Sequence, residues 1–193
     1  MTEEKIYIAI FASGSGTNAA KLLQYFNNHS YIEIKLIVCN NPKANVVDIA
    51  TRNHIELLMI EKERFSRGDG YAEAIKNKGI QWIILAGFLW KIPNTLIKAF
   101  PDKIINIHPA LLPKYGGKGM YGKHVHEAVI AAKESTSGIT IHLVDEIYDH
   151  GRVIFQTKCA VDSADTPEKL AKKIQALEHE YFGKVVEEVV RLA

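Results

Sequence analysis

Short runs of apolar, β-branched residues alternate along the first half of this chain with stretches whose apolar residues recur at helical spacing. The distance from one run to the next is about 22–26 residues, which is typical of strands that alternate with helices. The pattern predicts strands at residues 6–11, 32–38, 57–60, 82–86 and 104–107, and helices at 18–26, 46–52, 71–77 and 94–100.

The predicted strands are apolar at consecutive positions rather than at alternate ones. Such runs are expected when both faces of a parallel sheet are covered. We therefore expect an α/β fold with an open, mostly parallel, twisted sheet and helices on both faces. In the first predicted helix, Leu22, Leu23 and Phe26 lie on one stripe, which would pack on the sheet.

The pattern changes after residue 107, where Pro and Gly residues interrupt a long loop. A helix is predicted at 126–133, followed by strands at 138–144 and 153–161 with a polar turn between them. In the first of these strands, apolar residues alternate with Thr140 and His142. Alternation predicts an antiparallel or edge strand with one wetter face.

The last predicted helix begins at Ser163 or Asp165 and runs to residue 191. Thr166-Pro167-Glu168 is its start signal, because proline is favoured in the first turn of a helix. No repeat, low-complexity segment or linker interrupts the pattern. We expect one domain over residues 1–193.

Charge and composition exclude several classes of protein. The 24 Lys and Arg residues nearly balance the 22 Asp and Glu residues, which argues against binding of duplex nucleic acid. No segment reaches the roughly 18 apolar residues of a membrane helix, and the polar, acidic residues 1–5 do not resemble a signal peptide. Cys39 and Cys159 lie in apolar runs, as buried, reduced thiols do. We expect a cytoplasmic protein.

A glycine-rich turn, Ser13-Gly-Ser-Gly-Thr-Asn18, joins the first predicted strand to the first predicted helix. Backbone N–H groups at a helix N-terminus bind anions, and glycine allows their close approach. The turn formally matches a dinucleotide fingerprint, but the second strand ends at residues 38–42 without the carboxylate that would hold a ribose. A phosphate on a small substrate fits better. The alternative is a helix cap formed by Thr17 or Asn18 and nothing more.

Asn106 and His108 end the fifth predicted strand two residues apart, so both side chains project to the same side. Ligands bind at the carboxyl ends of such strands. An amide and an imidazole there can polarise a carbonyl and move a proton. The alternative for His108 is a capping or packing role.

An acidic segment, residues 145–151, joins the two late strands. It could be a simple turn, or one of its carboxylates could reach His108, stabilise the imidazolium and raise its pKa. No Ser or Cys has the setting of a nucleophile, which points to direct transfer between substrates. His124 and His126 lack a third ligand at suitable spacing, so we expect surface residues and no metal.

Together these motifs resemble the phosphoribosylglycinamide formyltransferases, or GAR transformylases, a folate-dependent family. The resemblance is carried by the glycine-rich turn and, in the family's order, by Leu85-Ala-Gly-Phe88, Asn106-Ile-His-Pro-Ala-Leu-Leu-Pro-Lys-Tyr115, Gly138-Ile-Thr-Ile-His-Leu-Val-Asp-Glu-Ile-Tyr-Asp149-His-Gly151 and Gln175-Ala-Leu-Glu-His179. It implies a Rossmann-like formyltransferase fold. It also implies formyl transfer from 10-formyltetrahydrofolate to the amine of 5-phosphoribosylglycinamide in purine (IMP) synthesis, through a tetrahedral intermediate.

The resemblance also implies the site residues. The catalytic residues would be Asn106, His108 and Asp149, with Thr140 and His142 in support. The phosphoribosylglycinamide site would be formed by Gly16, Thr17, Asn18, Gln175 and Glu178. The folate site would be formed by Arg67, Leu85, Phe88, Leu89, Trp90, Lys91, Ile92 and Asn106.

Some features depart from the family pattern. The arginine that contacts folate corresponds to Arg67 or to Arg64, and Trp90 or Lys91 stands where relatives often have arginine. The loop at residues 116–123 is long and glycine-rich, which suggests either a mobile lid or a surface insertion without a role. We expect a monomer or homodimer acting on small molecules, with no nucleic acid or membrane partner.

Related activities remain as alternatives. A tRNA formyltransferase would need a further C-terminal domain, and a formyltetrahydrofolate hydrolase usually carries an N-terminal regulatory domain. Neither is expected in this chain. Sugar formyltransferases fit the motifs poorly, and a catalytically inert folate- or nucleotide-binding protein is excluded only by activity.

Overall fold

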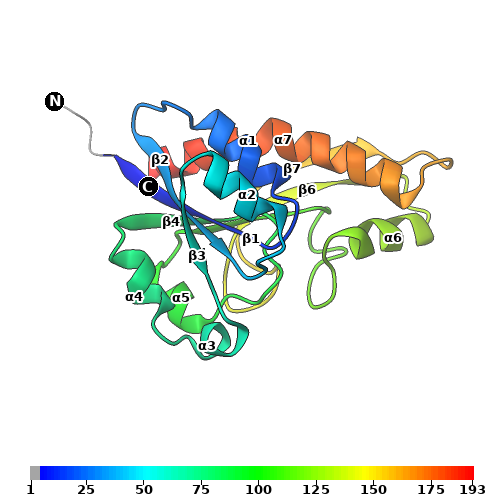
Figure 1. Cartoon of the computed structure of the whole chain (residues 1–193). Helices are drawn as coiled ribbons and strands as arrows, with labels where there is room; N and C mark the ends of the chain where they lie inside the picture. The colour runs from blue at the N-terminus through cyan, green and yellow to red at the C-terminus, as the bar shows by residue number, and fades with distance from the viewer. Residues whose placement is uncertain (1–4) are drawn as a thin grey trace.

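A computed structural model describes residues 5–193, in which one twisted sheet forms the centre of the molecule (Figure 1). The strands lie in the order β3-β2-β1-β4-β5-β6-β7. Strands β1 to β5 pair in parallel, and β6 and β7 are antiparallel to their neighbours. Their bounds are β1 Ile6–Ala12, β2 Ile32–Cys39, β3 Glu56–Met59, β4 Ile80–Leu85, β5 Ile104–His108, β6 Thr136–Leu143 and β7 Val153–Ala160. The predicted open, mostly parallel sheet is confirmed.

Helices cover both faces of this sheet, so the central strands β1, β2, β4 and β5 contribute buried residues on both sides, whereas the edge strands β3 and β7 are partly exposed. Figure 1 shows α1, α2 and α7 on one face and α3, α4 and α5 on the other, with α6 beside the end of α7. The helices are α1 Thr17–Tyr25, α2 Asn45–Arg52, α3 Lys62–Arg67, α4 Tyr71–Lys76, α5 Asn94–Ala99, α6 Lys123–Ala131 and α7 Pro167–Leu192. None of the helices in residues 5–193 is long and apolar enough to span a bilayer.

The order of the strands places a switch point at β1. From β1 the chain adds β2 and β3 on one side, then returns to add β4 and β5 on the other. The loops that leave β1 and β4 therefore diverge at the carboxyl ends of adjacent strands. Ligands bind in such a crevice in open α/β sheets.

The structure differs from the sequence-based expectation in β6. The prediction that one face of this strand is exposed to solvent is wrong, because Thr140 is fully buried and His142 is 1% exposed. Strand β6 is antiparallel, as predicted, but it lies between β5 and β7, and β7 forms the edge. The polar side chains are covered because the segment after His108 folds back over Thr140.

Two helices also differ from the pattern. Helix α3 was not predicted, because Phe65 is the one apolar residue among its six and therefore gives no helical periodicity. Helix α6 begins three residues before the predicted position. Helix α7 begins at Pro167, two residues after the later of its two predicted starts. Its predicted start signal is confirmed: the Thr166 side chain accepts a hydrogen bond from the Lys169 N–H, and Pro167 follows directly. The prediction of one domain over 1–193 includes residues 1–4, which lie outside the described residues.

Candidate active site

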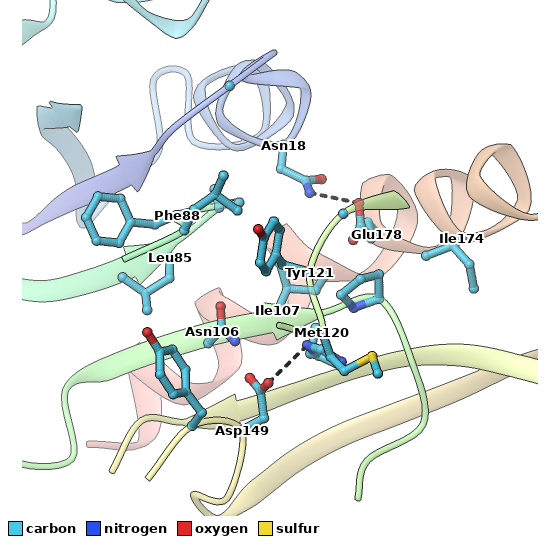
Figure 2. Close-up of a pocket in the computed structure, with 18 of the residues that line it drawn as sticks. Asn18, Leu85, Phe88, Asn106, Ile107, Met120, Tyr121, Asp149, Ile174 and Glu178 are labelled. Carbon is cyan, nitrogen blue, oxygen red and sulfur yellow. Dashed lines mark hydrogen bonds and ion pairs between the residues drawn. The ribbon is translucent and has the colours of Figure 1, made fainter. Parts of the chain in front are cut away.

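A cleft of about 880 Å³ opens at the carboxyl ends of β1, β4 and β5. Its wall brings together parts of the chain that are far apart in sequence, as Figure 2 shows for ten labelled residues. The segments that line it are residues 14–18, 85–92, 106–109, 117–123, 142, 144–145, 147–149 and parts of α6 and α7. All three predicted catalytic residues and the predicted phosphate loop therefore lie in one cavity.

The glycine-rich turn forms one end of this cleft. Gly16 has a φ of 71°, and a Cβ there would come within 2.8 Å of the Ile49 side chain and 2.9 Å of Val46. Only glycine fits this position without displacing α2. The N-terminus of α1 has no side-chain cap, so its N–H groups face the cleft without a competing acceptor from Gly16. This geometry suits an anion better than the simple helix cap considered above.

The side chains after Gly16 are held from α7. Gln175 Nε2 donates to Thr17 Oγ1 at 3.2 Å, and Asn18 Nδ2 donates to Glu178 Oε2 at 2.9 Å. Asn18 Oδ1 is buried without a partner among the described residues. Burial raises the pKa of Glu178, and the hydrogen bond from Asn18 opposes that rise. All five residues predicted for the phosphoribosylglycinamide site therefore line this end of the cleft.

Asn106 is oriented by the neighbouring antiparallel strand. It pairs in register with His142, and its Nδ2 lies 3.0 Å from His142 Nε2. His142 Nδ1 lies 2.8 Å from the Leu143 carbonyl, which places the imidazole proton on Nδ1 and leaves Nε2 as the acceptor for Asn106. The second N–H of the amide remains free for a ligand. His142 is therefore placed to orient Asn106, and its supporting role in the reaction stays a prediction.

His108 is held between a carbonyl and a carboxylate. Its Nε2 donates to the Tyr115 carbonyl at 2.8 Å, and its Nδ1 lies 3.6 Å from Asp149 Oδ2. The same carboxylate accepts a hydrogen bond from the Gly117 N–H at 2.8 Å, and its other oxygen lies 3.7 Å from His142. Figure 2 shows the Asp149 carboxylate directed at an imidazole on the wall of the cleft. The acidic turn thus reaches His108, as the functional interpretation requires.

The Asp149 carboxylate acts to raise the pKa of His108, as predicted, but the net shift of this pKa is downward. Burial lowers this pKa below its usual 6.5, and the opposing effect of the Asp149 carboxylate is smaller. The imidazole is 4% exposed, so loss of hydration disfavours its charged form. The pKa of Asp149 itself is also lowered: burial would raise it, but the contacts with His142, His108 and Gly117 together prevail. Asp149 is therefore a carboxylate at neutral pH beside a histidine that can gain a proton.

Thr140 holds the segment that follows His108. Its hydroxyl donates to the Ala110 carbonyl at 2.6 Å and accepts from the Leu112 N–H at 3.0 Å. Gln156 on β7 adds a further donor to the same hydroxyl at 2.8 Å. Thr140 does not line the cleft, so its predicted supporting role is exerted through the backbone of this segment.

An apolar slot follows β4 at the other end of the cleft. All six predicted folate residues of this segment line the cleft: Leu85, Phe88, Leu89, Trp90, Lys91 and Ile92. The Phe88 ring packs edge-on against Phe11, and Figure 2 shows it directed away from Asn106. Phe88 therefore supports the slot from behind. Ser13, the first residue of the glycine-rich turn, accepts a hydrogen bond from the Leu89 N–H at 3.0 Å and fixes the segment.

Arg67 and Arg64 are not among the residues that line the cleft. Arg67 forms an exposed ion pair with Asp69 at 2.8 Å, and the Arg64 guanidinium lies over the Tyr71 ring. The folate contact suggested for either arginine stays a prediction. The loop at 117–123 does line the cleft, which favours a role for it, and its closure as a lid also stays a prediction.

Two histidines of α6 have opposite environments. His124 is exposed, as predicted, but the prediction of a surface position for His126 is wrong, because His126 is 7% exposed and lines the cleft. Helical spacing that buries Val125 and Val129 on the same helix was the signal that could have placed His126 inside. Within residues 5–193, no cluster of three or more His, Cys, Asp or Glu side chains has the arrangement of a metal site.

Comparison with known proteins gives one family. The family model described as formyl transferase matches residues 6–186. A chloroplastic phosphoribosylglycinamide formyltransferase of Arabidopsis thaliana is 39% identical over 93% of this chain, and the match covers 63% of the plant protein. The phosphoribosylglycinamide formyltransferase of Bacillus subtilis is 33% identical, over 95% of this chain and 94% of its own length. The chain thus spans less than two thirds of the plant relative.

Solved structures agree with this match. The crystal structure of phosphoribosylglycinamide formyltransferase from Bacillus halodurans superposes with a TM-score of 0.87 at 33% identity, covering 95% of each chain. A glycinamide ribonucleotide transformylase of Geobacillus kaustophilus gives a TM-score of 0.88 at 31% identity. The similarity therefore extends over the sheet, the helices and the cleft.

Proposed function

The chain belongs to the formyl transferase family, and we propose that it transfers the formyl group of 10-formyltetrahydrofolate to the amine of 5-phosphoribosylglycinamide in purine (IMP) synthesis. One observation carries the proposal. Asn106, His108 and Asp149 lie in a single cleft between a phosphate-type loop and an apolar slot. The names of the Arabidopsis and Bacillus relatives support the same substrates.

The ends of the cleft differ in chemistry, as two unlike substrates require. The phosphate of the ribonucleotide would bind the N–H groups at Gly16–Asn18 with Gln175, and the ribose hydroxyls would face Glu178. The folate ring would enter the apolar slot at residues 85–92, where backbone groups provide polar contacts. The reacting atoms then meet beside Asn106 and His108.

The reaction needs no enzyme nucleophile, because the substrate amine attacks the formyl carbon itself. A new C–N bond forms, and the formyl oxygen becomes an oxyanion that accepts the free N–H of Asn106. The bond from the formyl carbon to the folate nitrogen then breaks, and a proton passes from the attacking amine to that nitrogen. The products are the formylated glycinamide and tetrahydrofolate.

His108 becomes protonated during the reaction, at the step in which the oxyanion forms. The imidazole is predominantly neutral before reaction at neutral pH, because burial lowers its pKa below 6.5. A negative formyl oxygen nearby raises that pKa, so His108 takes up the proton that the attacking amine releases as the oxyanion forms. The same proton passes on to the folate nitrogen when the bond from that nitrogen to the formyl carbon breaks. The Tyr115 carbonyl and the Asp149 carboxylate then face the two ring nitrogens and stabilise the imidazolium. Asp149 also organises the water that carries protons between amine and folate nitrogen.

The proposal includes a cytoplasmic protein that acts as a monomer or homodimer on small molecules without a bound metal. Near-neutral charge supports the small-molecule substrates, and a free, buried Cys39 fits a reducing compartment.

The function is tested by measuring the tetrahydrofolate that forms when the chain is incubated with both substrates. We expect turnover by the wild-type chain and a loss of about 100- to 1,000-fold in kcat for His108→Ala. His124→Ala, an exposed histidine outside the cleft, is the matched control and should keep wild-type turnover. Equal, slow release by wild type and His108→Ala would instead support the inert binding protein.

A further inference from the structure

Three buried histidines line the cleft, and the mechanism above uses only His108 and His142. His126 lies on α6, is 7% exposed and lines the cleft together with Asn106 and His108. Its neighbour His124 is exposed and forms an ion pair with Glu127. Of these two histidines, only His126 can reach a ligand in the cleft, so His124 can serve as its matched control.

The hydrogen bonding of His126 is incomplete. Its Nδ1 is buried and has no partner among the described residues. A buried donor without an acceptor is more costly and rarer than an acceptor without a donor. The favourable tautomer therefore leaves Nδ1 unprotonated and carries the proton on Nε2. His126 is then a donor that the protein itself leaves unused.

His126 stays neutral at neutral pH. Burial lowers its pKa, and charge on His108 lowers it further. A second cation beside a charged His108 would be unfavourable in this enclosed site. His126 is thus suited to donate a hydrogen bond to a neutral acceptor, and it is not suited to carry protons in the reaction.

The position of His126 indicates which part of the substrate it meets. It lies near enough to His108 to be affected by charge there, and its helix packs against α7, which provides Gln175 and Glu178 to the phosphate end. It therefore lies on the wall between the phosphate end and the reacting end. In 5-phosphoribosylglycinamide, the group between the ribose and the reacting amine is an amide.

We propose that His126 is a positioning residue whose Nε2–H donates a hydrogen bond to the amide carbonyl of the glycinamide group. This inference rests on the proposed function. The bond would fix the only rotatable part of the substrate between its anchored ribose and its amine. Orientation of the amine toward the formyl carbon would follow from it, since a small misplacement of reacting atoms slows the reaction strongly.

Binding of two ligands to three variants tests this role. The ligands are 5-phosphoribosylglycinamide and ribose 5-phosphate, which lacks the amide, and calorimetry gives both dissociation constants. His126→Phe keeps the packing and removes the donor, so it should bind the glycinamide about tenfold more weakly and ribose 5-phosphate as tightly as wild type. His126→Gln places an N–H near the Nε2 position and should restore binding to within about threefold. His124→Phe should change neither constant.

Other results would overturn the inference. Equal weakening of both ligands by His126→Phe would show a purely structural role, and unchanged binding of both would show no contact. If His126→Phe does not fold, His126→Asn replaces it, because its shorter side chain cannot reach the Nε2 position. The proposed function fails separately, if the wild-type chain releases no tetrahydrofolate from the two substrates.

Discussion

Two histidines on adjacent strands have different partners, and those partners decide what each residue can do. His142 has a carbonyl at Nδ1 and the Asn106 amide at Nε2, so it is a fixed acceptor that orients Asn106. His108 has a carbonyl at Nε2 and a carboxylate at 3.6 Å from Nδ1, so a second proton would have an acceptor waiting. His108 is therefore the residue that changes charge.

Removing the charge of Asp149 tests that distinction. Asp149→Asn keeps the size of the side chain and an oxygen for the Gly117 N–H, but it removes the negative charge that stabilises protonated His108. We expect kcat to fall by about 100- to 1,000-fold with little change in the melting temperature. The control is Glu146→Gln, an exposed residue of the same turn that does not line the cleft. Near-normal turnover of Asp149→Asn would make the turn merely structural.

Asn18 tests the assignment of the phosphate end. Its Nδ2 donates to Glu178, so Asn18→Ala removes the contact between α1 and the residue expected to face the ribose. The KM for 5-phosphoribosylglycinamide should rise about tenfold, while the KM for the folate changes less than twofold. Steady-state kinetics with one substrate varied at a time measure both values, and Asn53→Ala on the exposed end of α2 is the control. Equal increases for both substrates would place the phosphate elsewhere.

At the scale of helices and strands, the sequence predicts the positions of strands, which depend on the local pattern of apolar residues. It does not predict the burial of polar side chains, which depends on contacts between distant segments. Continuous apolar runs located β1, β2 and β5 to within a residue at each end, because both faces of those strands are buried. The sequence predicts one solvent-exposed face for strand β6, because Thr140 and His142 are polar. Only the fold shows that Thr140 binds the segment after His108 and that His142 contacts Asn106.

The site divides in the same way. Asn106 and His108 could be paired from sequence, since their spacing and strand end are local features. The contact from Gln175 to Thr17 spans 158 residues and could be expected only through family resemblance. The Tyr115 carbonyl and the Gly117 N–H, which hold His108 and Asp149, carry no side-chain signal at all.

Strand β6 offers a test of how the fold supports the site. Thr140→Val preserves shape but leaves the Ala110 carbonyl without its donor and the Leu112 N–H without its acceptor. Such groups cost about 1–3 kcal/mol in the free energy of unfolding when they remain buried. Urea denaturation should show this loss of stability, and steady-state kinetics should show a lower kcat. Thr140→Ser keeps the hydroxyl, so both its loss of stability and its loss of kcat should be smaller than those of Thr140→Val. A Thr140→Val protein as stable and active as wild type would contradict the role of the hydroxyl.

For the whole molecule, buried imidazoles make stability depend on pH. Burial lowers the pKa of His108, His126 and His179 in the folded chain below 6.5, so the unfolded chain binds more protons as the pH falls through that value. The free energy of unfolding should therefore decrease from pH 7.5 to pH 5.5. The raised pKa of Glu178 acts in the opposite direction, but it is one group against three.

Urea titrations at the two pH values measure this effect. The midpoint should be lower at pH 5.5, and the difference should be smaller for His126→Phe, which lacks one of the three imidazoles. His124→Phe, which alters an exposed histidine, should retain the wild-type difference. A higher midpoint at pH 5.5 would mean that these imidazoles are not held neutral by the fold.

In the proposed reaction, a formyl group is transferred from one substrate to the other while both are bound in the cleft. The most direct measurement follows that carbon: 10-formyltetrahydrofolate labelled with ¹³C in the formyl group is incubated with 5-phosphoribosylglycinamide and the wild-type chain, and the products are analysed by mass spectrometry. We expect the label to appear in the formylated ribonucleotide, with one label for each tetrahydrofolate released. Label recovered as free formate, or retained entirely on the folate, would contradict it.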